Sequence, residues 1–113
     1  MQYMLLIYVP DDAPSEGGQG MPDMAPWNAY TDWLREKGIY RGGEPLAPTS
    51  AATTIRVRDG RTLTTDGPFA ETKEVLGGYY IVDTDDFDLA LEAAARCPGA
   101  LYGSMEVRPI VGM

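Results

Sequence analysis

The residues best suited to chemistry lie in one short polar segment, DGPFAETKE, at residues 66–74. Asp66 and Glu71 supply carboxylates, and Lys73 supplies an amine between them and the strand that follows. A carboxylate whose pKa is raised by burial can act as a general base. A lysine can hold a substrate carboxylate or phosphate, with a glutamate orienting it. We therefore predict Asp66, Glu71 and Lys73 as candidate catalytic residues.

Each of these side chains also has a purely structural interpretation. Asp66 precedes Gly67-Pro68, where an aspartate commonly accepts hydrogen bonds from the amides of a turn. Glu71 and Lys73 could form a solvated surface pair, which adds little stability. Both interpretations stay open, although a plain surface loop has no need of so dense a run of polar groups.

Glu44 and Tyr80 are candidate ligand-binding residues. Glu44 follows Gly42-Gly43, which lets the backbone approach another group closely, or which marks a bulge in an edge strand. Tyr79 and Tyr80 must point to opposite faces of one strand. One of them belongs to the core, and the other can line a pocket or a dimer interface.

Arg56 and Phe69 complete the candidate ligand-binding set. Arg56 would form an anion site if it and Arg108 both point inward, and is otherwise exposed or ion-paired. Phe69 lies inside the polar segment, where it can flank a bound molecule.

The absence of histidine excludes whole classes of active site. Ser-His-Asp and Cys-His triads cannot form, and the usual general base near neutral pH is missing. Histidine is also the commonest ligand of zinc, copper and non-haem iron, and Cys97 with carboxylates would make a poor zinc site. We expect neither a metal site nor a cofactor.

Length and charge restrict the partners. The chain has 113 residues, which fits one domain over 1–113. Its net charge is −8. No lysine and arginine cluster suits nucleic acid or an anionic membrane, and no apolar run is long enough to span a bilayer. A single cysteine excludes an intrachain disulfide and fits a cytoplasmic location. So small a domain buries only about two-thirds of its unfolded surface, which favours self-association.

The first half of the chain reads as strand, helix and strand. Residues 3–9 are mostly apolar, which predicts a strand buried on both faces, and residues 10–22 form a loop. Trp27, Tyr30 and Leu34 recur on one helical face. An interrupted strand follows at 39–46.

A hairpin is predicted between the two halves. Residues 53–58 and 62–65 flank Asp59-Gly60, a strong two-residue turn signal. The tight register would place Arg58 opposite Arg61, which like charges disfavour. The register therefore stays open.

The second half repeats the strand, helix and strand order. Residues 76–83 form a strand, and a helix capped by Thr84 or Asp85 follows. The last strand covers 104–110. The predicted buried stripe of the helix consists of Phe87, Ala90, Leu91, Ala94 and Ala95. Together the elements predict an α+β, ferredoxin-like split βαβ fold with an inserted hairpin. Both helices are expected on one face of its sheet. A second copy of the chain is the simplest cover for the other face.

The polar segment also carries a family resemblance. DGPFAETKE resembles the signature of the DGPF-domain proteins, which belong to the YCII-related family. The resemblance extends over nearly the whole chain, through YMLLIY (3–8), GGEPL (42–46), LGGYY (76–80) and EVRP (106–109). It implies a homodimer in the form of a dimeric α/β barrel, a bacterial and cytoplasmic protein, and an activity that is not established.

The family also implies possible roles. Members often lie beside, or are fused to, extracytoplasmic-function sigma factors, which implies regulation. Some YCII-related proteins carry a histidine–aspartate pair in a pocket. Because this chain lacks histidine, only Asp66 or Glu71 could remain of such a site.

Three functions follow as hypotheses. The favoured one is a non-catalytic or regulatory protein that binds a small anionic or polar metabolite in a pocket near the DGPF segment. The first alternative is a small-molecule enzyme that uses carboxylate and lysine acid–base chemistry, with the 10–22 loop as a lid. The second is an interaction dimer associated with sigma-factor regulation.

Overall fold

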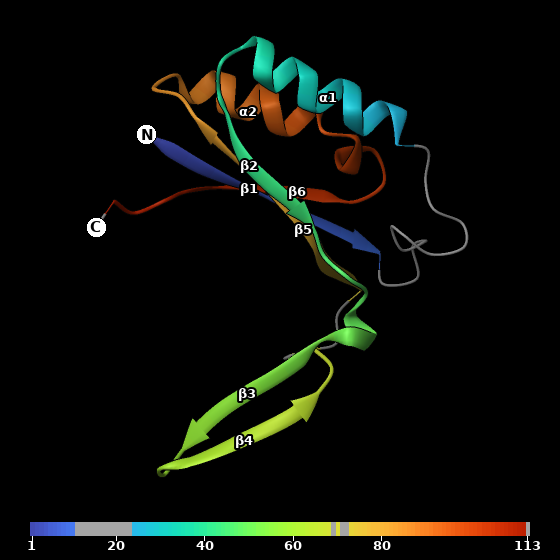
Figure 1. Ribbon diagram of the computed structural model, residues 1–113, viewed down its shortest axis with the longest axis vertical. Coiled ribbons are helices and arrows are strands. Elements are labelled where there is room, and N and C mark those ends of the chain that lie inside the picture. Colours follow the sequence, from blue (N-terminus) through green and yellow to red (C-terminus); the bar gives the residue numbers. More distant parts are fainter. Residues whose placement is uncertain (11–23, 69, 71–72, 113) are drawn as a thin grey trace.

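The computed structural model describes residues 1–10, 24–68, 70 and 73–112. Figure 1 shows the elements along the chain. They are β1 (Gln2–Pro10), α1 (Ala25–Glu36), β2 (Tyr40–Pro45), β3 (Thr53–Arg58), β4 (Arg61–Asp66), β5 (Glu74–Asp83), α2 (Phe87–Arg96) and β6 (Ser104–Pro109), with short 3-10 turns at Thr49–Ala51 and Pro98–Leu101.

A four-stranded antiparallel sheet carries both helices on one face (Figure 1). Its strand order is β2-β5-β1-β6, which places the first and third strands of the split βαβ pattern in the centre. The predicted α+β class is confirmed, and the order is compatible with a ferredoxin-like fold. Neither helix in the described part of the chain has the length and apolar character to cross a membrane.

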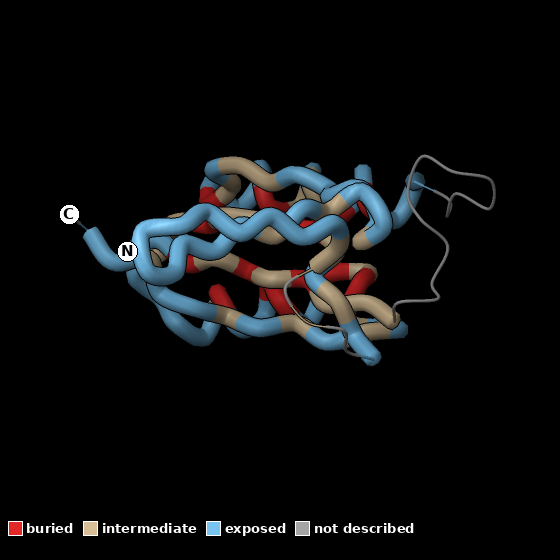
Figure 2. Tube along the Cα trace, turned by 90° about the horizontal axis from the view of Figure 1, so that it is seen from below, coloured by how far each residue is buried: buried red, intermediate tan, exposed pale blue. Residues whose placement is uncertain are grey.

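Only the helix-facing side of β1 is fully buried, so the prediction of burial on both faces was wrong. Buried and half-buried residues alternate along the strand: Tyr3, Leu5 and Ile7 are buried, and Met4, Leu6 and Tyr8 are half-buried. The apolar run is therefore continuous in sequence but covered on one side only. In Figure 2 the buried residues, in red, lie on the strands and helices around the core, whereas the β3–β4 hairpin in front is almost entirely in the pale blue of exposed residues.

Helix α1 follows its predicted pattern. Trp27, Tyr30 and Leu34 are its buried residues and pack in the core cluster. The Tyr30 hydroxyl donates a hydrogen bond of 2.6 Å to the backbone carbonyl of Ala93, which ties α1 to α2.

Helix α2 begins one or two residues later than predicted from its candidate caps Thr84 and Asp85. Its cap is Asp86, whose carboxylate accepts hydrogen bonds from the amides of Asp88 and Leu89. Thr84, one of the predicted caps, instead accepts a hydrogen bond from the Asp86 amide. Several oxygen-bearing side chains compete at this start, and only the backbone conformation decides which of them caps.

The buried stripe of α2 is also displaced. The buried residues are Ala90, Ala93 and Ala94, whereas Phe87 and Leu91 are 50% and 43% exposed. Three alanines on one face let the helix approach the sheet closely, and that face lies about 100° from the one containing Leu91. The predicted stripe was therefore right for Ala90 and Ala94 and wrong for Phe87, Leu91 and Ala95.

Strand β2 is an irregular edge strand, as predicted. Its register against β5 shifts between Tyr40 and Gly42. Beyond Pro45 the chain leaves the sheet, and the Leu46 amide donates a hydrogen bond of 2.9 Å to the Gly77 carbonyl.

Strands β3 and β4 form a separate two-stranded sheet, which we name the hairpin arm (residues 53–66). The turn residues Asp59 and Gly60 have φ angles of 52° and 75°, as a two-residue type I′ turn requires. Arg58 and Arg61 lie directly opposite each other. The tight register therefore forms in spite of the like charges.

Replacing Tyr30 tests the link between the helices. Burial raises the pKa of the Tyr30 hydroxyl above its ordinary value of 10. Its contribution to stability is therefore complete below pH 10 and decreases as the pH rises further, by about 1.4 kcal/mol per pH unit. We expect Tyr30→Phe to lower the free energy of unfolding by about 1–3 kcal/mol at neutral pH, because the Ala93 carbonyl loses its donor.

The measurement is urea denaturation between neutral pH and pH 11, with the exposed Tyr102 changed to Phe as the control. Tyr30→Phe should reduce the decrease in the free energy of unfolding at alkaline pH, and Tyr102→Phe should not. Equal behaviour of the two variants would contradict this role of Tyr30.

Candidate functional site

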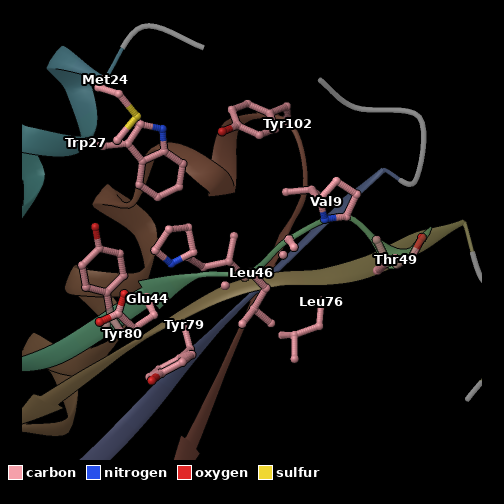
Figure 3. Close-up of a pocket in the computed structure, with 18 of the residues that line it drawn as sticks. Val9, Met24, Trp27, Glu44, Leu46, Thr49, Leu76, Tyr79, Tyr80 and Tyr102 are labelled. Atoms are coloured by element: carbon pink, nitrogen blue, oxygen red, sulfur yellow. The ribbon is translucent and has the colours of Figure 1, made fainter. Parts of the chain in front are cut away.

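A pocket of about 250 Å³ lies where the start of α1 meets the ends of β1, β2 and β5 (Figure 3). Trp27 and Thr31 line it from α1, and Tyr80 lines it from β5. Residues 46–49 and 75–76, on either side of the hairpin arm and the DGPF segment, close its outer end. The described residues of the polar segment, 66–68, 70, 73 and 74, are not part of this lining.

Tyr80 is fixed in the wall of this pocket by hydrogen bonding and by ring packing. Thr31 donates its hydroxyl proton to the Trp27 carbonyl at 3.0 Å, so the 3.1 Å contact between the Thr31 and Tyr80 hydroxyls has Tyr80 as donor. The Tyr80 ring packs edge-on against Tyr30 and Tyr40, with centroid separations of 5.1 and 6.4 Å. The wall is therefore ordered before any ligand arrives.

The described pocket lining is mainly apolar, includes several aromatic side chains and is nearly uncharged. Glu44 is the only charged residue among the described residues that line it, and no described lysine or arginine does so. Glu44 pairs with Tyr79 across β2 and β5 and is exposed, so its carboxylate stands at the rim. The aromatic residues of the lining are Trp27, Tyr40, Tyr79, Tyr80 and Tyr102.

The hollow reaches both sides of the sheet edge. Figure 3 shows Trp27 and Tyr80 on the side of the helices, and Tyr79 and Leu76 on the opposite side of the β5 ribbon. Gly77 and Gly78 line the pocket between them. One end of a bound molecule can therefore lie in the core-facing part and the other end at the uncovered sheet face.

Gly43 sets how closely β2 approaches β5 beside the pocket. A Cβ atom at this position would lie 2.7 Å from the Tyr79 carbonyl oxygen and 2.9 Å from Cδ1 of the Tyr80 ring. At the neighbouring Gly42, a Cβ atom would meet nothing within 4 Å. The close approach of the β2 backbone to β5, which the glycine pair predicted, therefore occurs at Gly43 and not at Gly42.

The structure brings together only some of the predicted site residues. Glu44 and Tyr80 line the pocket. Asp66 at the end of β4, Lys73 before β5 and Arg56 on the hairpin arm are exposed and do not line it. Phe69 and Glu71 lie outside the described residues, so their predicted roles stay predictions.

Sequence reasoning missed much of the lining. The sequence predicts Trp27 only as part of an apolar helical face that packs in the core or an interface; it is 7% exposed, and it also lines the pocket. Met24 and Tyr102 come from distant parts of the sequence and carry no motif. Only the topology, which brings α1 over the ends of β1 and β5, assembles these side chains.

Comparison with known proteins gives one family. The family model of the YCII-related domain matches residues 1–113. An uncharacterised protein of Rhizobium meliloti (strain 1021), R00369, is 49% identical over 67 residues. That match covers 58% of this chain and 54% of the relative, so it spans about half the length of the curated protein it matches.

The two adjacent glycines of β2 give a paired test of the pocket wall. We expect Gly43→Ala to lower the free energy of unfolding by about 1–3 kcal/mol, because its Cβ would overlap the β5 backbone. Gly42→Ala should change it by less than about 0.5 kcal/mol. Chemical denaturation of both variants is the measurement, and a Gly42→Ala effect as large as that of Gly43→Ala would contradict the geometry.

Proposed function

The chain belongs to the YCII-related family, and from that premise we propose that it binds a small, largely apolar molecule with a neutral or positively charged polar end. The supporting observation is the lining of the pocket, which combines aromatic side chains with one rim carboxylate. Pockets of this kind bury an apolar ligand body and use a few polar groups to orient it.

The lining favours a cationic or neutral ligand over an anionic one. Arg56 and Lys73, on which an anionic ligand depended, are not part of it. Aromatic faces attract cations, and Glu44 adds a negative charge at the rim. An anion would meet no described positive side chain in the wall and would approach a carboxylate.

Binding is supported better than acid–base catalysis. The enzyme hypothesis needs Asp66 and Lys73 to face a common substrate, and both are exposed away from the pocket lining. The lining offers ordered hydroxyl groups, such as those of Thr31 and Tyr80, that suit hydrogen bonding to a bound molecule. The association with sigma-factor regulation stays a prediction from the family.

Three probes that share a benzene ring and a two-carbon chain separate the ligand classes. They are phenethylamine, 2-phenylethanol and phenylacetate, which are cationic, neutral and anionic at neutral pH. We expect phenethylamine to bind best and phenylacetate worst, as measured by titration with NMR detection of backbone amides. Glu44→Gln should remove the preference for the amine over the alcohol, because the rim charge is lost.

Matched tryptophan variants locate the binding. Trp27→Leu should abolish the response to phenethylamine, whereas Trp33→Leu, on the same helix but outside the lining, should keep it. Circular dichroism establishes that each variant is folded under the conditions used. Preferred binding of phenylacetate, or binding that survives Trp27→Leu, would contradict the proposal.

We also propose that the chain pairs with a second copy through the uncovered sheet face. This face carries half-buried apolar side chains on the two central strands: Met4, Leu6 and Tyr8 of β1, and Tyr79 and Ile81 of β5. A contiguous apolar surface of this kind marks an interaction site. A symmetric contact between two copies uses the same surface twice, and a dimeric α/β barrel is the arrangement that the family resemblance implies.

Two leucine variants test the pairing. Leu6 lies on the uncovered face, and Leu91 lies on the outer side of α2, where it is 43% exposed. Sedimentation velocity at micromolar concentration should show a dimer for the unchanged chain and for Leu91→Glu, and a monomer for Leu6→Glu. A monomeric unchanged chain would refute the pairing.

A further inference from the structure

The hairpin arm exposes nearly all of its side chains. Five of the six residues of β3 and all six of β4 are exposed. Ile55, Val57 and Leu63 are exposed by 63%, 60% and 48%. A hairpin of two strands is at best marginally stable alone in water, and it needs a further surface to pack against.

The two faces of the hairpin arm have different chemistry. Cross-strand partners share a face, so Ile55 and Val57 lie together with Thr62 and Thr64. The opposite face carries Leu63 and three arginines, Arg56, Arg58 and Arg61. One face is therefore aliphatic and β-branched, with Asp66 opposite Thr53 at its end, and the other is basic.

The charge of the hairpin arm is opposite to that of the rest of the chain. The arm holds three of the nine basic residues and two of the seventeen acidic residues, so its formal charge is +1 and that of the remainder is −9. Arg58 and Arg61 face each other directly, which destabilises an isolated hairpin. Neither forms an ion pair with another described residue. An acidic surface placed against them would remove this repulsion.

The uncovered sheet face offers acidic groups of this kind. Glu44 on β2 and Glu106 on β6 lie on it, on the two edge strands, together with Arg108 of β6. Glu106 accepts a hydrogen bond of 3.2 Å from the Tyr8 hydroxyl, which holds its carboxylate on this face.

The hairpin arm also projects in a suitable direction. Figure 1 shows it on the side of the sheet opposite the helices, beyond the ends of β2 and β5. The radius of gyration is 15.7 Å, against about 13 Å for a compact chain of this length, which reflects this extension. A second copy packed on the uncovered sheet face would lie on the same side as the arm.

We propose that the hairpin arm of each copy binds the acidic surface of a second copy. Its aliphatic face supplies buried area, and its arginines are attracted to the partner's carboxylates. This inference rests on the pairing proposed above and adds a second contact to it. By symmetry, two arms are exchanged in each dimer.

Hydrogen exchange on the full chain tests the inference. The arm amides should be protected at concentrations where sedimentation shows a dimer, and should lose that protection on dilution to the monomer. We expect Val57→Ser to weaken self-association about tenfold, because a buried valine is lost. Val111→Ser, at a valine that is 79% exposed and off the arm, should leave it unchanged.

Charge variants form a second pair. Arg58→Glu should weaken self-association and reduce its sensitivity to salt, whereas Lys37→Glu, an equal charge change at the end of α1, should do neither. A dimer whose arm amides exchange as fast as those of a synthetic 53–66 peptide would overturn the inference and leave the pairing intact. Arm protection that persists in the monomer would also overturn it. A chain that is monomeric throughout would overturn both the inference and the pairing.

Discussion

The four-stranded sheet has helices on only one of its faces. The core lies on that covered face, and the hairpin arm lies on the side of the uncovered face. On the covered face, Leu5, Leu34 and Val82 are completely buried and form the centre of the core. On the other face, apolar side chains of the same central strands stay half exposed. Because exposed apolar surface is unfavourable in water, that face and the hairpin arm on its side both favour a contact with another chain.

The sequence predicts elements well where one pattern dominates, and poorly where several residues are equivalent. Trp27, Tyr30 and Leu34 define one helical face without ambiguity, and α1 buries that face. At the start of α2, neighbouring residues with similar side-chain oxygens leave the cap undecided, and Asp86 takes the role. In the hairpin, the like charges of Arg58 and Arg61 disfavour the tight register, but the turn conformation of Asp59-Gly60 favours it more strongly, and the tight register forms.

The candidate site was only partly predictable, because its wall is assembled from segments that are distant in the sequence. The glycine pair and the tyrosine pair pointed to Glu44 and Tyr80, and both line the pocket. The DGPF segment, with its dense polar residues, pointed to Asp66 and Lys73, and the structure places both at the surface, outside the pocket lining. Trp27 could not be identified, since an aromatic residue on an apolar helical face usually packs in the core and this one does both.

The most direct test of whether a second chain covers the helix-free face of the sheet is to measure how accessible that face is to solvent in solution. Methyl groups of Met4, Leu6 and Ile81 can be compared with those of Leu101, which is 87% exposed, by their NMR line broadening in the presence of a soluble paramagnetic agent. At dimer-forming concentrations, the three methyl-bearing residues of the sheet face should be shielded and Leu101 should be broadened. Equal broadening of all four would show that this face remains open to water, and would contradict the account.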